Sequence, residues 1–133
     1  MAGFSDVYEV KILDVLFGKA TLTSPACWLT IATAAISDAD TGSTLSEPTS
    51  GTFARARISA LGMGSAASGV ISNSAVISFV AAASAWGSIT HFAICDASVA
   101  GNVMAFCSVQ TAKSVASDDT VYFDVGALKV YLS

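Results

Sequence analysis

Hydrophobic and polar positions alternate with a period of two along most of the chain from residue 26 onward. Leu29 and Ile31, for example, alternate with Trp28 and Thr30. Successive side chains of a strand point to opposite faces, so this alternation predicts strands that each bury one face. Comparable segments run over residues 53–58, 76–79, 89–94, 103–110, 120–125 and 127–132. About seven strands separated by turn-rich stretches predict a mainly β fold, an antiparallel β-sandwich or jelly roll over residues 26–133.

The N-terminal segment has a helical period instead. Its hydrophobic positions recur at steps of three and four residues, as on one face of a helix. They are Val7, Val10, Leu13, Leu16 and Phe17. Asp6 can cap the helix, Glu9 can complete a capping box, and Gly18 can adopt the left-handed conformation beyond its end. The sequence therefore predicts one amphipathic helix over about residues 6–17.

The hydrophobic stripe of this helix needs a partner that covers it. It can pack on the sheet of its own domain, which we favour slightly, or it can contact a neighbouring subunit. Under the second alternative, Val10, Leu13 and Phe17 are the candidate subunit contacts.

The composition favours a role in an assembly. The 133 residues fit one domain spanning 1–133. Only 12% of them are charged, whereas 53% are hydrophobic, and ordinary globular domains carry roughly 25% charged residues. A trimer, another homo-oligomer or a place inside a larger particle would cover the excess apolar surface.

Charge and hydropathy argue against nucleic-acid and membrane partners. The net charge is −4 and six Lys and Arg residues are spread along the chain, which is not the footprint of a phosphate-binding protein. The longest apolar run, residues 26–35, is shorter than the roughly 20 residues of a membrane helix. Residues 1–6 do not resemble a signal peptide, so we do not expect export of the chain from the compartment where it is made.

Arg55 and Arg57 are the one pair of neighbouring cations, and their spacing places them on the same side of a strand. A guanidinium in a chain so poor in charge should find one of the few carboxylates. That partner lies either within the fold, as an internal salt bridge, or across a subunit boundary. Both arginines are therefore candidate subunit contacts as well.

Two polar stretches, residues 37–51 and 62–74, interrupt the hydrophobic pattern and predict long loops, either contact arms or plain surface loops. Asp38, Asp40 and Gly42 are similar to the start of a calcium loop, but the acid expected at its twelfth position falls on Thr49. An Asp-rich turn is the simpler interpretation. We therefore predict no metal site.

No catalytic constellation stands out. His91 is the only histidine, and on an alternating strand it is more often a hydrogen-bonded structural residue than a base. The chain has neither a nucleophile elbow nor a P-loop. Cys27, Cys95 and Cys107 lack metal-ligand spacing and predict buried thiols, although Cys95 and Cys107 could meet on neighbouring strands. We expect no enzyme and no cofactor.

A series of short motifs, taken in order, resembles a known viral family. The helix closes on Phe-Gly over residues 13–18, and a strand that opens a loop rich in Thr, Asp and Gly follows. Further motifs are the aromatic-Ala-Arg strand at 53–55, the Ser-x-Trp-Gly-x-Ile-Thr-His-Phe segment at 84–92, the Gly-Asn-x-hydrophobic segment at 101–104 and the Gly-x-Leu-x-Val ending at 126–130. This order is similar to that of small virion proteins of tailed bacteriophages, known as tail-fibre or head-decoration proteins.

The resemblance implies a non-enzymatic structural protein of a virion that works by shape and surface burial. Its partners would be further copies of itself and the major capsid protein or tail proteins of the same phage. We favour capsid decoration, as a cement protein, narrowly over a tail-fibre or tail-tip component that helps host attachment. A glycan-binding module is a third class.

The segment at 84–92 also predicts part of the structural core. A strand this apolar should bury Trp86 and Phe92, and His91 should be held by a hydrogen bond within the sheet or at a subunit boundary.

Overall fold

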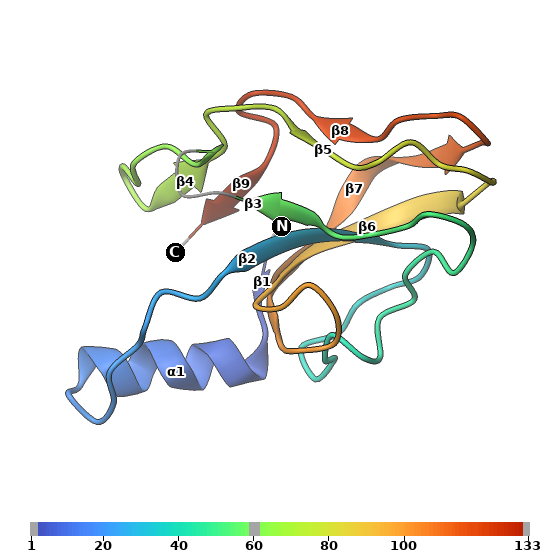
Figure 1. Ribbon diagram of the computed structural model, residues 1–133. Helices are drawn as coiled ribbons and strands as arrows, with labels where there is room; N and C mark the ends of the chain where they lie inside the picture. The colour runs from blue at the N-terminus through green and yellow to red at the C-terminus, as the bar shows by residue number, and fades with distance from the viewer. Residues whose placement is uncertain (1–2, 59–61, 132–133) are drawn as a thin grey trace.

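A five-stranded antiparallel sheet forms the centre of the protein in the computed structural model, which describes residues 3–58 and 62–131. Its spatial order is β1-β7-β6-β2-β3, so that the longest strands lie in the middle (Figure 1). The strands are β1 (Gly3–Phe4), β7 (Val103–Val115), β6 (Gly87–Cys95), β2 (Cys27–Ala32) and β3 (Ala56–Ile58).

Two short antiparallel ribbons form a second layer over one face of this sheet (Figure 1). One pairs β4 (Val70–Ser72) with β9 (Lys129–Tyr131), and the other pairs β5 (Ile77–Ser78) with β8 (Tyr122–Phe123). The predicted mainly β, antiparallel fold with one helix near the N-terminus is confirmed. The second layer differs from a full sandwich sheet in being made of two separate ribbons.

The main hydrophobic core lies between the two layers. The period-two pattern accounts for it, since Leu29 and Ile31 of β2 point into this core opposite Ile94 and Phe92 of β6. The second layer contributes Ile77 together with other buried residues of its connections, namely Phe79, Ala82 and Leu128. The core therefore depends on contacts between segments far apart in sequence.

A smaller core covers the opposite face of the sheet. Here Ala32, Ala93, Cys95 and Val103 are buried, with Ile36 of the long loop after β2 packed against them. Cys107 lies opposite Phe92 in the β6–β7 register, and Phe92 packs on the main core. Cys95 and Cys107 therefore belong to opposite faces of the sheet and are both free. A disulfide between Cys95 and Cys107, which their neighbouring strands would have allowed, does not form.

Several predicted boundaries were wrong, since β7 continues to Val115 beyond the predicted 103–110 and the strand β1 was not predicted. Residues 53–55 are not a strand, because the pairing of β3 with β2 begins only at Ala56, which faces Leu29. The stretch 62–74 is not only a loop, because it contains β4, which pairs with β9. Buried Asn73 holds this corner: its amide donates to the carbonyls of Ala75 and Asp124 and its oxygen accepts from the Leu128 N–H.

The predicted helix is present as α1 (Asp6–Leu16), and Gly18 adopts the predicted left-handed conformation at φ 69°. The capping prediction was wrong in its residue: Ser5 is the N-cap and makes no side-chain cap bond, because its hydroxyl donates instead to the Val103 carbonyl. Tyr8 is the only buried residue of α1. Packing of the hydrophobic stripe on its own sheet, our favoured alternative, is therefore not what the structure shows.

Candidate functional site

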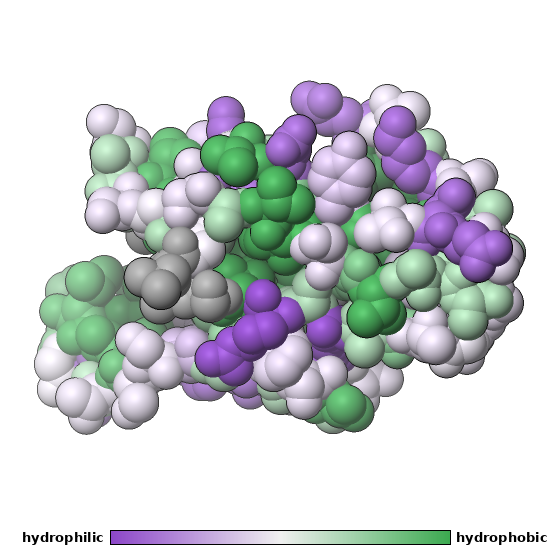
Figure 2. Space-filling model, turned by 45° about the horizontal axis from the view of Figure 1, so that its top comes forward, coloured by the Kyte–Doolittle hydropathy of each residue, from purple (hydrophilic) through white to green (hydrophobic). Residues whose placement is uncertain are grey.

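Six large hydrophobic side chains on or just after α1 are exposed to solvent, and we call them the apolar helix surface. They are Val7, Val10, Leu13, Val15, Leu16 and Phe17. Exposure is highest at the far end of the helix, where Leu16 is 72% and Phe17 75% exposed. Figure 2 shows hydrophobic side chains gathered at the lower left, where this helix projects from the body. Such a group on one element usually marks a contact with another molecule.

Hydrogen bonds at the start of the helix attach it to the sheet and to two loops. The Ser5 N–H donates to the Met104 carbonyl at 3.1 Å, and the Asp6 N–H donates to the Asp38 carbonyl at 3.2 Å. The Tyr8 hydroxyl donates to Oδ2 of Asp96 at 3.0 Å. Because these bonds all lie at the start of α1, its second half extends beyond the support of the sheet (Figure 1).

Asp96 is the carboxylate on which this attachment depends. Burial by itself raises the pKa of Asp96, but hydrogen bonds from the backbone and side-chain N–H groups of Asn102 and from Tyr8 outweigh it and hold the pKa below its usual range. Burial, aided by the Asp96 carboxylate, raises the pKa of Tyr8. No pattern in the sequence predicted this role of Asp96, although the Gly-Asn segment that supplies Asn102 is among the motifs.

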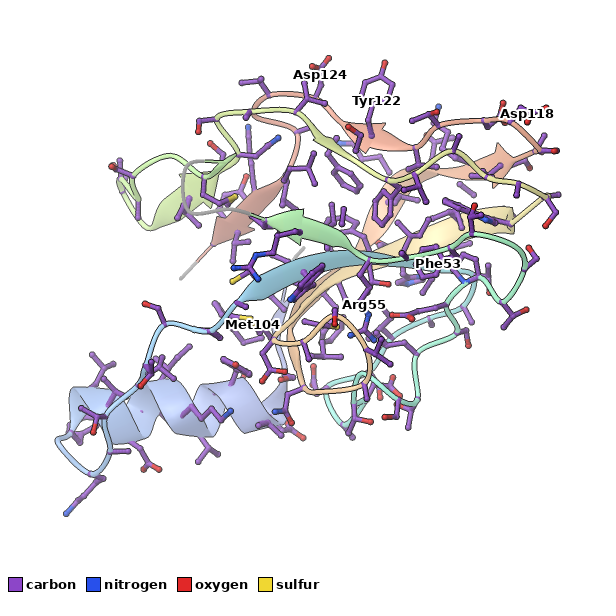
Figure 3. All side chains as sticks on the ribbon, viewed as in Figure 1. Phe53, Arg55, Met104, Asp118, Tyr122 and Asp124 are labelled. Carbon is purple, nitrogen blue, oxygen red and sulfur yellow. The ribbon has the colours of Figure 1, made fainter. Side chains whose placement is uncertain are left out.

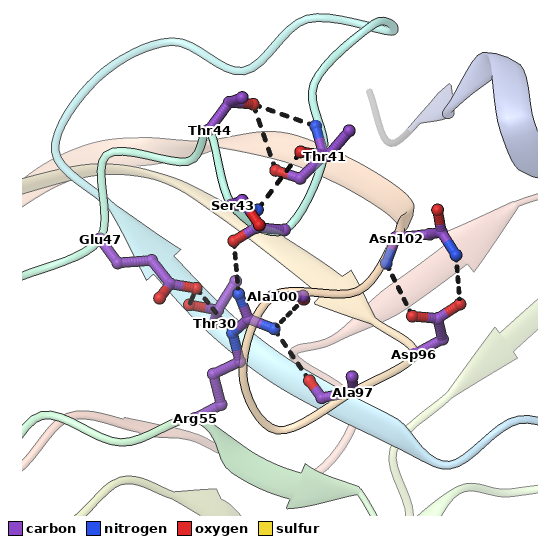
Figure 4. Close-up of polar contacts among 11 residues, drawn as sticks. Thr30, Thr41, Ser43, Thr44, Glu47, Arg55, Asp96, Ala97, Ala100 and Asn102 are labelled. Carbon is purple, nitrogen blue, oxygen red and sulfur yellow. Dashed lines mark hydrogen bonds and ion pairs between the residues drawn. The ribbon is translucent and has the colours of Figure 1, made fainter.

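Arg55 lies at the centre of a second polar cluster, which joins the loop between β2 and β3 to the loop between β6 and β7 (Figures 3 and 4). Its Nε contacts Oε1 of Glu47 at 2.6 Å, and its terminal nitrogens donate to the carbonyls of Gly42, Ala97 and Ala100, each at 2.8 Å. Only 6% of Arg55 is exposed. A buried guanidinium whose nitrogens bond a carboxylate and three carbonyls fixes the relative positions of the two loops.

The two arginines thus have different roles. Arg55 forms the internal salt bridge that was one of its two alternatives, so its charge is used within its own chain and not at a subunit contact. Arg57 is exposed on β3 and stacks over the ring of Trp28, with 5.3 Å from its guanidinium carbon to the ring centre. It remains a candidate contact.

The Arg55 cluster explains the long polar loop after β2. A Cβ on Gly42 would collide with the Ala100 carbonyl oxygen, so only glycine permits this close approach of the two loops. Asp40 accepts bonds from the N–H and hydroxyl of Ser37 and from the Thr44 hydroxyl. The backbone N–H of Ser37 contributes most to lowering the pKa of Asp40. This is the Asp-rich turn that we preferred to a calcium loop.

The predicted core residues are placed in part as expected. Trp86 is buried and packs edge-on against Phe53 and Phe79. Nδ1 of His91 lies 2.8 Å from the Thr90 hydroxyl, which is the expected hydrogen bond. Phe92 is only half-buried, because its ring meets Phe123 at the margin of the second layer, where that layer leaves part of the sheet open. The predicted burial of Phe92 is therefore met in part, since the side chain packs against the main core without being enclosed by it.

The described residues show neither a metal site nor a membrane-spanning helix. Within residues 3–58 and 62–131, no three His, Cys, Asp or Glu side chains are placed to share a metal ion. Over the same residues, no helix has the length and hydropathy that would span a bilayer. Burial raises the pKa of Cys95 to about 11, as suits a thiol that packs in the core.

Comparison with known proteins adds to this geometry. The model of one protein family, described as podophage GP4 fiber I protein gp80, matches residues 3–131, which is nearly the whole chain. No curated protein matches significantly. A match of this extent includes α1, both layers and the Arg55 cluster, and it agrees with the resemblance found in the motifs. The chain therefore belongs to the podophage GP4 fiber I protein gp80 family and is a structural protein of a phage virion.

Proposed function

We propose that the chain is a component of a phage fibre and that the apolar helix surface of α1 holds it in the virion. Two observations support this proposal. The family is named for a fibre protein, and the structure leaves α1 uncovered by its own chain. The second observation carries the proposal, because exposing hydrophobic side chains to water is unfavourable in free energy, and assembly with a partner removes that exposure.

The energy available from this surface is sufficient for a specific contact. Full burial of a Leu or Phe side chain contributes about 1.5–3 kcal/mol. Leu16 and Phe17 are among the most exposed large side chains of the protein. Covering them together with Leu13 and Val10 would therefore offset much of the free-energy cost of the translational and rotational entropy lost on association.

Capsid decoration is the second candidate. It is favoured by the compact arrangement of the two layers and by a sequence in which no repeat suggests a fibrous shaft. Under this alternative α1 has the same role, but the surface that covers it belongs to the capsid. The two candidates differ in location and not in the chemistry of the contact.

The experiment compares phage carrying the natural chain with phage carrying Leu13→Asp. Leu13 is exposed, so the charge should leave the circular-dichroism spectrum of the purified chain unchanged. It should remove the chain from particles, because an unpaired carboxylate is costly at an apolar contact. Quantitative mass spectrometry of separated heads and tails measures the loss. The natural chain should be found in the tail fraction.

Val125→Asp is the matched control, since Val125 is 60% exposed between β8 and β9 and follows Asp124, which lies on the side of the protein away from α1 (Figure 3). Particles should retain this variant. Normal incorporation of Leu13→Asp would refute the role of α1. Recovery of the natural chain in the head fraction would refute the fibre and favour decoration.

A further inference from the structure

A hydrophobic pocket lies at the foot of α1. It has a volume of about 260 Å³ and hydrophobic side chains alone line it, among them Phe4, Cys27, Met63, Met104 and Val130. Phe4 belongs to β1, which leads directly into the helix, and Met104 lies in β7, where its carbonyl accepts from the Ser5 N–H just before α1 (Figure 3). A pocket without polar groups holds water poorly and favours an apolar occupant.

The free end of α1 is the part of the chain that suits this pocket best, but it cannot enter the pocket of its own chain. The helix has 11 residues, and at 1.5 Å per residue it is about 16 Å long. It starts beside Phe4, at the pocket, and ends at Leu16, away from it. Only another molecule can bring Leu16 and Phe17 to this position.

We propose that the occupant is a second copy of this chain: Leu16 and Phe17 at the end of one helix dock into the pocket at the foot of the helix of another copy. The volumes agree, since a cavity of about 150 Å³ already accommodates benzene, the size of a Phe ring. Met63 and Met104 suit the site as well, because unbranched thioether side chains adapt to an inserted ring.

Lys19 provides a cation for the same arrangement. Asp6 and Glu9 lie in the first turn of α1, and the last turn carries Asp14 and no basic residue. Lys19 follows two residues after Phe17, is exposed, and its N–H donates to the Asp14 carbonyl. Docking brings Lys19 of one copy toward Asp6 and Glu9 of the other, where its charge partly offsets the repulsion that Asp14 would otherwise add.

This inference rests on the proposed role of α1 as a contact and identifies what covers it. Sedimentation equilibrium of the purified chain tests it first. The natural chain should associate, and Phe17→Asp should raise the dissociation constant at least tenfold, whereas Val125→Asp should not change it. Lys19→Glu should also weaken association, and combining it with Glu9→Lys should restore it.

A photocrosslinking side chain identifies the site. When p-benzoylphenylalanine replaces Phe17, its excited ketone inserts into nearby C–H bonds, with a preference for methionine. A mixture of ¹⁵N-labelled and unlabelled chains distinguishes crosslinks between copies from crosslinks within one copy. Adducts should form between copies at Met63 or Met104. Adducts elsewhere, or a natural chain that remains monomeric, would overturn the inference.

The two proposals fail in different ways. If no crosslinks form at the pocket but Leu13→Asp is still lost from particles, α1 contacts another virion protein. In that case only the docking between two copies of the chain is refuted. If Leu13→Asp is incorporated normally, the role of α1 in the virion falls, whatever sedimentation gives.

Discussion

Arg55 is the single residue on which most of the loop structure depends. It connects Glu47 and Gly42 of the loop after β2 with Ala97 and Ala100 of the loop after β6. Glu47 also accepts a bond from the buried Thr30 hydroxyl at 2.7 Å. Removing one member of a buried pair leaves the other charge and several carbonyls without partners, which is more costly than losing one bond.

Arg55→Ala should therefore lower the free energy of unfolding by about 3–5 kcal/mol. The free energy of unfolding of Arg55→Lys should lie between those of the natural chain and Arg55→Ala, because an ammonium keeps the charge but cannot reproduce the planar guanidinium. Urea titration followed by tryptophan fluorescence measures both changes. Arg57→Ala is the control: this arginine stacks on Trp28 at the surface, so it should cost less than about 1 kcal/mol. Equal losses for Arg55→Ala and Arg57→Ala would contradict the structural role of Arg55.

At the scale of elements, α1 is a projecting helix with a narrow attachment. Its packing within the chain rests largely on Tyr8, which is 3% exposed, and on the bonds that Ser5, Asp6 and Tyr8 make to the sheet and loops. Lys11 lies over the Tyr8 ring at 4.5 Å and covers the same spot. The attachment is therefore polar and localised, whereas the projecting part is apolar, as suits an element whose partner is another molecule.

Acid should weaken this attachment. The pKa of Asp96 is lower in the folded protein than the usual value of about 3.9. A carboxyl group whose pKa is lower in the folded state than in the unfolded state stabilises the fold when the pH is above its unfolded-state pKa. This stabilisation is lost as the pH falls through the folded-state pKa. The difference in unfolding free energy between the natural chain and Asp96→Asn should be constant from about pH 7 to pH 5 and shrink below about pH 4.

Urea titrations of both proteins across this range provide the measurement. Asp40, whose pKa is lowered by the Ser37 backbone and the Thr44 hydroxyl, is present in both, so the difference isolates Asp96. A difference that stays the same down to pH 3 would show that Asp96 does not stabilise the fold through its charge.

At the scale of the whole molecule, one core between two unequal layers holds the fold together. Trp86 stands at its centre with Phe53 and Phe79, at ring separations of 5.2 and 6.5 Å. Among the described residues, its Nε1 is the one buried side-chain nitrogen or oxygen without a hydrogen-bond partner. Its contribution therefore comes from its volume and ring contacts and not from its N–H.

Replacement of Trp86 separates these contributions. Trp86→Ala should cost about 3–5 kcal/mol, since it leaves a cavity that the two layers cannot close. Trp86→Phe should cost clearly less, because it keeps an aromatic ring and loses no hydrogen bond. Differential scanning calorimetry of the purified chain gives both values. A Trp86→Phe variant as unstable as Trp86→Ala would mean that the indole N–H has a partner in solution.

The sequence alone determined the classes of structure that local periodicity encodes. Alternation placed Leu29 and Ile31 on one face, and three- and four-residue spacing placed α1 and its left-handed Gly18. The order of short motifs identified a phage virion family, which the family match confirmed. These features could be predicted because each depends on neighbours within a few residues.

The tertiary structure decided which surfaces are covered, because burial depends on segments far apart in the chain. The same amphipathic pattern fits a helix packed on its own sheet and one that projects from it, and only the fold left Leu16 and Phe17 exposed. Likewise, Arg55 could have paired within the chain or outside it until the loops brought Glu47 and three carbonyls around it. The strand β4 formed within a polar stretch because β9, nearly 60 residues later, supplied its backbone partner.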